Sequence, residues 1–335
     1  MKRIAAVASI VLLSACGISS QKADLFRKGI PQAKDVKVDV PAKGSALTGE
    51  AQRHDGLQGE TANFYLFTRT ITVVCNTATV SVLGLVKAIS NYPPTSLTSD
   101  TAVWGPHTEA LSPNTYKFTV TKTGDDAYTY MLESKGKAEA DSEFKIILSG
   151  SHTVATDAAG SPTENYGNGT FLLDWDKISK LPEHGPEVGT ATFTYARANA
   201  TADVTIDIDF HQVKDNETGK LVDANYKYDA TPANGGSFQF QMAKDLDNGK
   251  NGRVAVENMA IKSRWLQTGA GRSDVKATGG DLVTTVATAS ECWDENFASQ
   301  YLATSWTTPA SVWGTESAGC SFASAEYSTL APLVP

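Results

Sequence analysis

The sequence predicts a mainly β fold: a curved antiparallel meander of about ten strands, half-barrel or barrel-like, packed on one N-terminal helix. Three observations lead to this prediction. From residue 115 onward apolar and polar residues alternate, as in strands with one buried and one solvated face. Clusters of Gly, Asn and Asp separate these runs too closely for the crossover helices that parallel strands need. Before residue 92 the apolar period is helical instead.

The predicted helix covers residues 70–91. Its apolar residues recur three or four positions apart: Ile71, Val74, Cys75, Ala78, Val82, Leu85, Val86 and Ile89. Pro93-Pro94 ends the helix, because proline cannot continue the backbone hydrogen bonding. So much apolar surface favours a position against the concave face of the sheet. A transmembrane helix is not expected, since Arg69, Asn76 and Lys87 interrupt the apolar run.

The predicted strands share a period of two and lie between turn-forming clusters. They cover residues 116–121, 128–132, 144–148, 171–173, 190–198, 204–211, 226–228, 238–242, 254–256 and 282–288. A short helix is predicted over residues 174–181, with Asp174 or Asp176 as its N-cap and Pro182 at its end.

The first residues are organised like a signal peptide. Lys2 and Arg3 precede an apolar run over residues 4–13, which is too short to span a bilayer. The run ends in Leu13-Ser14-Ala15-Cys16, which resembles the lipobox of bacterial lipoprotein precursors in all four positions. The resemblance implies cleavage after residue 15, with diacylglycerol on the sulfur of Cys16 and a further acyl chain on the new N-terminus. The alternative is a soluble secreted protein with a cysteine near an ordinary cleavage site.

The lipobox resemblance also implies a place in the cell envelope. Gly17 rather than Asp follows Cys16, which favours a lipid anchor in the outer membrane, with the protein on its periplasmic or surface face. Residues 16–49 are predicted to form an acylated tether, and residues 50–335 a single β-rich domain. The formal net charge of −8 argues against a nucleic-acid partner, because phosphates repel an acidic surface.

The sequence has four cysteines, and we assign each a role. Cys16 takes the lipid, and Cys75 lies on the apolar stripe of the helix, where it packs as a small hydrophobe. Cys292 and Cys320 flank a loop-rich aromatic stretch and are predicted to form a disulfide that ties down the C-terminal loop region, residues 291–335. The alternative is three buried free thiols. No metal site is predicted, because the cysteines and histidines do not cluster at ligand spacing.

The sequence offers little evidence of catalysis. It has no nucleophile elbow, zinc-protease motif or phosphate-binding loop, so no catalytic residue or cofactor is predicted. Asp207 and Asp209 share one strand face and could serve glycoside cleavage or calcium binding, but a solvated sheet face is the simpler interpretation. Asp174 and Asp176 flank Trp175, which would suit a sugar platform, although helix capping is the simpler interpretation.

The most distinctive segment runs from Ser263 to Asp294. Arg264, Arg272, Trp265 and Trp293 are predicted to form a stacked, salt-bridged plug tied down by the disulfide. The segment resembles the C-terminal part of uncharacterised bacterial lipoproteins, which implies a location and no activity. The alternative is a binding loop whose Arg272 reaches an anionic ligand.

The leading functional hypothesis is a non-catalytic lipoprotein, anchored in the outer membrane, that binds a lipid or other amphiphile in a groove of its curved sheet. Val82, Val86 and Ile89 would line that groove. The architecture alone is similar to the half-barrel carriers that shuttle lipoproteins. The alternative is a structural or interaction lipoprotein with a filled core and an envelope protein as partner. A carboxylate-dependent hydrolase is the third hypothesis.

Overall fold

The chain folds into two compact units. The computed structural model describes residues 22–32, 36–42, 58–215, 219–246, 252–305 and 311–333. The first unit comprises Met1–Asp35 and Val80–Glu187, and the second comprises Val36–Thr79 and Val188–Pro335. Each contains an antiparallel sheet and part of one long helix, α2 (Asn63–Ser90). The predicted signal peptide, residues 1–15, and the predicted lipid attachment site, Cys16, lie outside the described residues.

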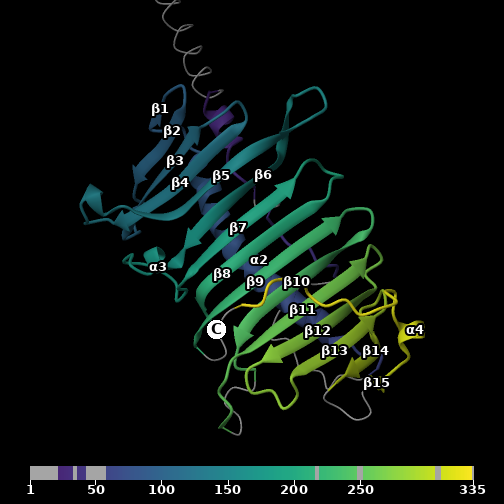
Figure 1. Cartoon of the computed structure of the whole chain (residues 1–335). Coiled ribbons are helices and arrows are strands. Elements are labelled where there is room, and N and C mark those ends of the chain that lie inside the picture. Colours follow the sequence, from purple (N-terminus) through teal and green to yellow (C-terminus); the bar gives the residue numbers. More distant parts are fainter. Residues whose placement is uncertain are drawn as a thin grey trace, which may run out of the picture. The chain divides into compact units, whose positions relative to one another are not determined.

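The sheet of the first unit has its strands paired in sequence order (Figure 1). They are β1 (Ser96–Leu97), β2 (Thr101–His107), β3 (Asn114–Lys122), β4 (Ala127–Gly136), β5 (Lys145–Thr156) and β6 (Pro162–Asp174). Each is antiparallel to the next. The short helix α3 (Trp175–Ile178) follows, with Asp174 as its N-cap, so the predicted short helix and one of its two candidate caps are confirmed.

Part of the predicted tether belongs to the core of the first unit. Residues 22–27 are helical, and the ring of Phe26 packs edge-on against Tyr128 with 6.5 Å between centroids. Arg27 donates from Nε to the carbonyl oxygen of Ser90 at the end of α2. In the second unit, the described residues 36–42 place Val38 in the core. The tether assignment to residues 16–49 was therefore too long, because widely spaced apolar residues resemble a linker in sequence.

The sheet of the second unit also follows sequence order. Its strands are β7 (Thr190–Arg197), β8 (Val204–Lys214), β9 (Leu221–Thr231), β10 (Gly235–Lys244), β11 (Glu257–Leu266), β12 (Gly271–Gly279), β13 (Val286–Trp293), β14 (Ser299–Thr304) and β15 (Ser311–Trp313). All neighbours are antiparallel. A single-turn helix, α4 (Glu316–Gly319), lies in the C-terminal segment, residues 314–333.

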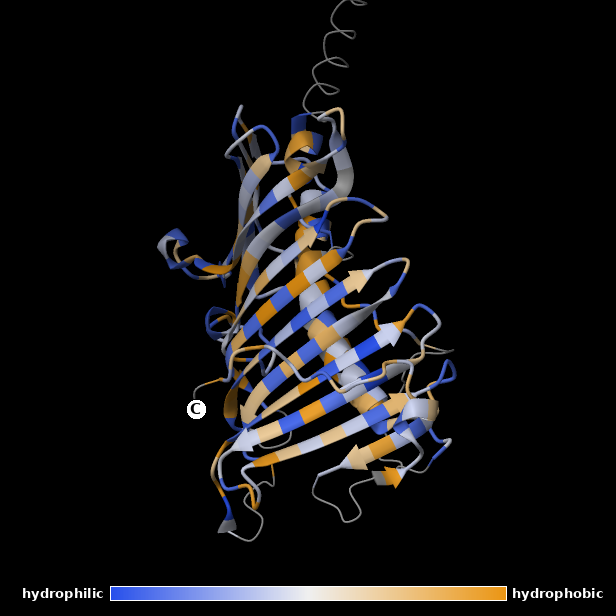
Figure 2. Cartoon of the chain, turned by 45° about the vertical axis from the view of Figure 1, so that its right-hand side comes forward, coloured by the Kyte–Doolittle hydropathy of each residue, from blue (hydrophilic) through white to orange (hydrophobic). Residues whose placement is uncertain are grey.

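The strand register builds one apolar face, here called the inner face. Ile208, Tyr226, Phe240 and Ile261 lie directly opposite one another on β8 to β11, and all four are buried. Along these strands hydrophobic and hydrophilic residues alternate (Figure 2). The first half of α2 lies on this inner face, and the C-terminal segment crosses the opposite, outer face over β10 to β13 (Figure 1).

Two glycines on the inner face make room for tryptophan rings. Gly236 lies opposite Trp265, and Gly271 lies opposite Trp293. A β-carbon at either glycine would collide with the ring of its partner. The absence of a side chain therefore lets each large ring lie flat across the neighbouring strand, a device that also fixes strand register.

The predicted fold is confirmed in class and corrected in detail. The chain is mainly β with antiparallel pairing, but it has fifteen strands in its described parts rather than about ten. The barrel-like closure was wrong: among the described residues, β1 does not pair with β6, nor β7 with β15. The segment 254–256 is not a strand, whereas β1, β2, β11, β12, β14 and β15 were missed. β2 contains Pro106, and β12 has Gly271 and Ser273 at inner-face positions, which breaks the apolar alternation.

The long helix begins earlier than predicted. It starts at Asn63 rather than residue 70 and ends at Ser90, close to the predicted end. Its cap is not local: the buried carboxylate of Glu291, on β13, accepts the backbone N–H of Phe64 at 2.7 Å. A capping partner more than two hundred residues away leaves no signal in the sequence around the helix start.

Candidate functional site

The outer face of the second unit carries a cluster of buried charges on β11 and β12. Arg264 and Arg272 lie directly opposite each other and would repel. The fully buried carboxylate of Asp274 offsets this repulsion. It accepts hydrogen bonds from Arg264 Nη2 at 3.1 Å and from Arg272 Nε at 2.8 Å. Ser290 on β13 also donates to Asp274, at 2.6 Å. Charge-assisted hydrogen bonds to one carboxylate thus hold both guanidinium groups.

The C-terminal segment closes this cluster with two further carboxylates. Glu316 accepts from Arg272 at 2.6 Å. Glu326 accepts from Arg264 at 2.5 Å and from Lys262 at 2.7 Å. The hydrogen bond from Lys262 and the charge of Arg264 lower the pKa of the Glu326 carboxyl. The ionised form of Glu326 is therefore the one that fits the cluster.

Backbone contacts bind the same segment to the sheet along its length. Arg272 donates to the carbonyl oxygen of Phe322, and Arg264 donates to that of Ser324. The amide of Glu326 donates to Asp274 at 3.0 Å, and the amide of Thr329 donates to Gln239 at 2.8 Å. Both arginines thus bind groups of the protein's own chain. This supports the predicted plug rather than the alternative of a binding loop for an anionic ligand.

The predicted disulfide is present and belongs to this arrangement. Cys292 and Cys320 are bonded, with 5.2 Å between their α-carbons. Cys292 lies opposite Arg272 on β13, so the bond attaches the end of α4 beside the charge cluster. The other thiol of the described chain, Cys75, is buried in α2, and burial raises its pKa to about 12. Cys75 therefore packs as a thiol, as the helical stripe predicted.

The two tryptophans of the predicted plug are not part of it. Trp265 and Trp293 lie on the inner face, because neighbouring residues of a strand point to opposite faces. The indole of Trp293 donates to the carbonyl oxygen of Gly269 at 2.9 Å and packs on Tyr65 of α2. The ring of Trp265 packs on Tyr228 with 6.3 Å between centroids. The plug is thus ionic on one face and separate from the aromatic core on the other.

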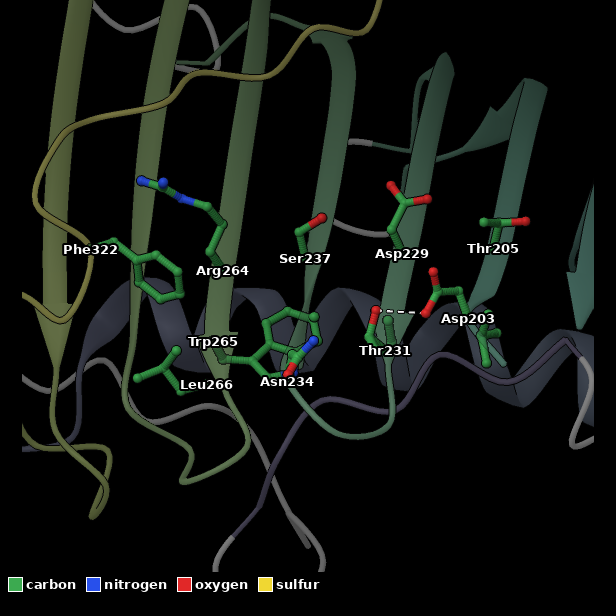
Figure 3. A pocket seen from close by; sticks show the side chains of 14 residues that line it. Asp203, Thr205, Asp229, Thr231, Asn234, Ser237, Arg264, Trp265, Leu266 and Phe322 are labelled. Carbon is green, nitrogen blue, oxygen red and sulfur yellow. Dashed lines mark hydrogen bonds between the residues drawn. The ribbon is translucent and has the colours of Figure 1, made fainter. Parts of the chain in front are cut away.

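A pocket of about 340 Å³ opens beside the charge cluster, on β8 to β11 (Figure 3). Thr205, Asp229, Ser237 and Arg264 lie directly opposite one another on these four strands and line it. Gly235 contributes no side chain at its end. The pocket therefore has acidic groups on one side and a guanidinium on the other.

The polar groups of the pocket differ in whether they have hydrogen-bond partners within the protein. Asp203 accepts from the hydroxyl of Thr231 at 2.7 Å. Burial raises the pKa of the Asp229 carboxyl. The carboxylates of Asp207 and Asp203 raise it further, whereas the nearby lysines lower it. Arg264 Nε is buried and has no hydrogen-bond partner among the described residues. A buried donor of this kind is costly unless something accepts its hydrogen bond.

The residues predicted to line a lipid groove lie in the second half of α2. Val86 is fully buried, and Val82 and Ile89 are half-buried. By length and composition α2 could cross a membrane. One third of its most apolar window is buried within the protein.

The weaker catalytic candidates do not come together. Asp209 is exposed and Asp207 half-buried on the outer face of β8. Trp175 is buried, and Asp174 caps α3 by accepting from Lys177 N at 2.9 Å, so these residues form a helix cap rather than a sugar platform. Within the described residues no three His, Cys, Asp or Glu side chains are arranged to hold a metal ion.

Sequence patterns missed the residues that complete these sites. Glu291, Glu316 and Glu326 gave no signal, because each acts through a partner more than forty residues away in the chain. Asp274 was missed because it looks like one more polar residue on a solvated strand face, although its partners Arg272 and Arg264 are near in sequence. No protein-family model matches the chain, and neither a curated protein nor a solved structure matches it.

Proposed function

We propose that this protein is a non-catalytic lipoprotein of the cell envelope that works as an interaction module, with α2 as a permanent part of its core. This is the filled-core alternative to a lipid carrier. The observation that carries it is the polar match between α2 and the inner face of the second sheet.

That match rests on buried hydrogen bonds. Thr68 of α2 hydrogen-bonds Ser263 through their hydroxyls at 2.6 Å, and Ser263 in turn hydrogen-bonds Ser273 at 2.6 Å. Glu291 caps the first turn of α2 and also accepts from Ser299 at 2.8 Å. An acyl chain in place of α2 would leave these groups unpaired, at about 1–3 kcal/mol each. The inner face therefore suits this helix better than it suits a lipid.

Aromatic packing adds to the same interface. The ring of Tyr65 stacks on Phe297 with 4.3 Å between centroids, and its hydroxyl donates to the carbonyl oxygen of Pro41. Asn76 exchanges two hydrogen bonds with the backbone of Val38. The described residues 36–42 thus bind α2 as well, which supports a fixed rather than a displaceable helix.

The envelope location rests on the lipobox, Leu13 to Cys16. Substituting Cys16→Ser should move the protein from the membrane fraction to the soluble fraction. Continued membrane association of the variant would contradict the lipid anchor.

Native mass spectrometry of the protein, purified from membranes in mild detergent, tests the filled core. We expect the acylated protein to carry only its covalent chains, and the Cys16→Ser form to carry no added mass. A stoichiometric mass on both forms that extracts into organic solvent would contradict this function and restore the carrier hypothesis.

A further inference from the structure

We propose that one side of α2 lies on the lipid surface of the membrane that carries the protein. This side, here called the outward face, consists of Thr70, Val73, Thr77, Val80, Gly84 and Ala88. The inference rests on the lipid anchor of the proposed function and adds a second contact with the bilayer, made by the folded body. In this arrangement the helix lies on the membrane and does not span it.

The outward face is exposed and uncharged. Its residues recur every three or four positions, so they share one side of the helix. All six are exposed, Val73 by 46% and Val80 by 39%, and a β-carbon built at Gly84 would meet no atom of the rest of the protein within 4 Å. None of them is charged, in a chain with 20% charged residues. The side of a helix that faces water is normally polar or charged, so this side suits an apolar environment.

The two threonines of the outward face use their hydroxyl hydrogens within the helix. Thr70 donates to the carbonyl oxygen of Leu66 at 2.9 Å, and Thr77 donates to that of Val73 at 2.8 Å. Threonine is accommodated in membrane helices in the same way, because no water is present there to bond the hydroxyl. These hydroxyl groups therefore have no free hydrogen to offer a polar protein partner, which favours lipid as the occupant of the face.

The predicted lipid anchor lies close to one end of α2. Arg27 donates from Nε to the carbonyl oxygen of Ser90 at 2.7 Å and from Nη2 to that of Tyr92 at 3.0 Å, so the helical residues 22–27 are fastened to the end of α2. Residues 17–21 separate this short helix from Cys16, a span of at most about 20 Å. Acyl chains on Cys16 would therefore hold the end of α2 near the membrane surface.

Exposed side chains at this end of α2 match a membrane interface. Tyr92, just past the helix, is 72% exposed, and Leu25 is 54% exposed. Tyrosine is enriched at membrane interfaces, because its ring is apolar and its hydroxyl can stay hydrated. Lys87 is also exposed, and its long side chain can reach lipid headgroups. Because the protein as a whole is acidic, we expect it to prefer a zwitterionic bilayer.

The experiment places the acylated full-length protein in phosphatidylcholine vesicles, with the fluorophore NBD on one introduced cysteine, Val73→Cys. Cys75 is buried, and Cys292 and Cys320 are bonded to each other, so the introduced thiol is the reactive one among the described cysteines. Flotation with the vesicles first tests the anchor. We then expect nitroxide groups on the lipids to quench the label about twofold or more, because the outward face lies at the boundary of headgroups and acyl chains.

The matched control carries the label at Asp209→Cys, an exposed site on the outer face of β8, on the opposite side of the sheet from α2. Nitroxide lipids should leave this label almost unquenched. Adding Thr77→Glu to the Val73→Cys protein puts a charge on the outward face, one turn from the label. It should abolish the quenching while the protein still floats, and the exposed position of residue 77 should leave the thermal unfolding midpoint nearly unchanged.

A floating protein whose labels at residues 73 and 209 are quenched equally would overturn this inference and leave the anchor intact. A protein that does not float would contradict the anchor itself, and this inference with it. In the Cys16→Ser form without vesicles, the label at residue 73 should be open to iodide in solution. Protection from iodide there, or disulfide-linked dimers of the unlabelled Val73→Cys protein, would show that protein covers the face and would overturn the proposal.

Discussion

Asp274 is the residue on which the outer face of the second unit depends. Its two carboxylate oxygens separate two arginines that lie directly opposite each other, and its side chain is fully buried. Burying charges is costly, so such a site is stable only when each charge has its partner. Ser290, Glu316 and Glu326 complete the set.

Substituting Asp274→Asn should therefore be strongly destabilising. It leaves Arg264 and Arg272 facing each other, and we expect the free energy of unfolding to fall by about 3–5 kcal/mol in urea titrations. Asp209→Asn, on an exposed site of the same sheet face, should change it by less than about 0.5 kcal/mol. Similar values for the two variants would contradict the role of Asp274.

His152 of the first unit should make stability depend on pH. It is buried on β5, opposite Tyr128, and burial lowers its pKa to about 4. The unfolded chain binds a proton near pH 6.5 and the folded chain does not, so stability is complete above pH 6.5 and falls between pH 6.5 and 4. The loss is on the order of 3 kcal/mol.

The check is the slope of unfolding free energy against pH. In His152→Phe the slope between pH 6.5 and 4 should flatten, whereas in His184→Gln, an exposed site, it should stay as in the parent protein. An unchanged slope in His152→Phe would show that other groups govern acid stability.

At the scale of elements, α2 depends on a cap supplied by the sheet. Glu291 is fully buried and accepts a hydrogen bond from the N–H of Phe64. Burial raises the pKa of its carboxyl, and the hydrogen bonds that the carboxyl accepts lower the pKa by less. A carboxylate at a helix N-terminus also interacts favourably with the helix dipole. The helix start is therefore tied to β13.

Glu291→Ala should release the first turn of α2. We expect a loss of about 2–3 kcal/mol and faster hydrogen exchange at residues 64–67, measured by mass spectrometry. Glu295→Ala, an exposed site in the next loop, is the matched control. Unchanged protection at residues 64–67 in Glu291→Ala would mean that the cap does not hold the helix.

The elements that sequence could predict are those whose pattern is local. β8 shows strict alternation, and α3 has its cap beside it, so both were found. β12 was missed because its inner-face positions include Gly271 and Ser273, so no apolar alternation marks the strand. Its outer-face residues Arg272 and Asp274 look solvated in sequence, but they lie under the C-terminal segment. The charge cluster was half predicted: its arginines stand out in sequence, but Glu316 and Glu326 come from the distant C-terminal segment, and Asp274 on β12 looks like an ordinary solvated residue.

At the scale of the whole molecule, the folded body begins closer to the N-terminus than the sequence suggests. The first described residues, 22–32, place Ala23, Phe26 and Ile30 in the core of the first unit. If Cys16 carries the lipid, residues 17–21 allow a span of at most about 20 Å between the acyl chains and the folded body. The protein would then stay near its membrane.

Phe26→Ala tests this boundary. We expect a loss of about 3–5 kcal/mol, because the ring packs in the core against Tyr128. Leu25→Ala, at a neighbouring site that is 54% exposed, should have little effect. If both substitutions were neutral in thermal and urea unfolding, residues 22–32 would be a tether after all.

The central claim is that α2 is a fixed part of the core, and cysteine trapping in membranes tests it most directly. The hydroxyls of Thr68 and Ser263 are 2.6 Å apart, so the double variant Thr68→Cys/Ser263→Cys should crosslink almost completely in the full-length protein. Thr70→Cys/Ser263→Cys, with residue 70 exposed, should not crosslink. Poor crosslinking of the first pair, or equal crosslinking of both as mapped on peptides, would contradict a helix fixed on the inner face.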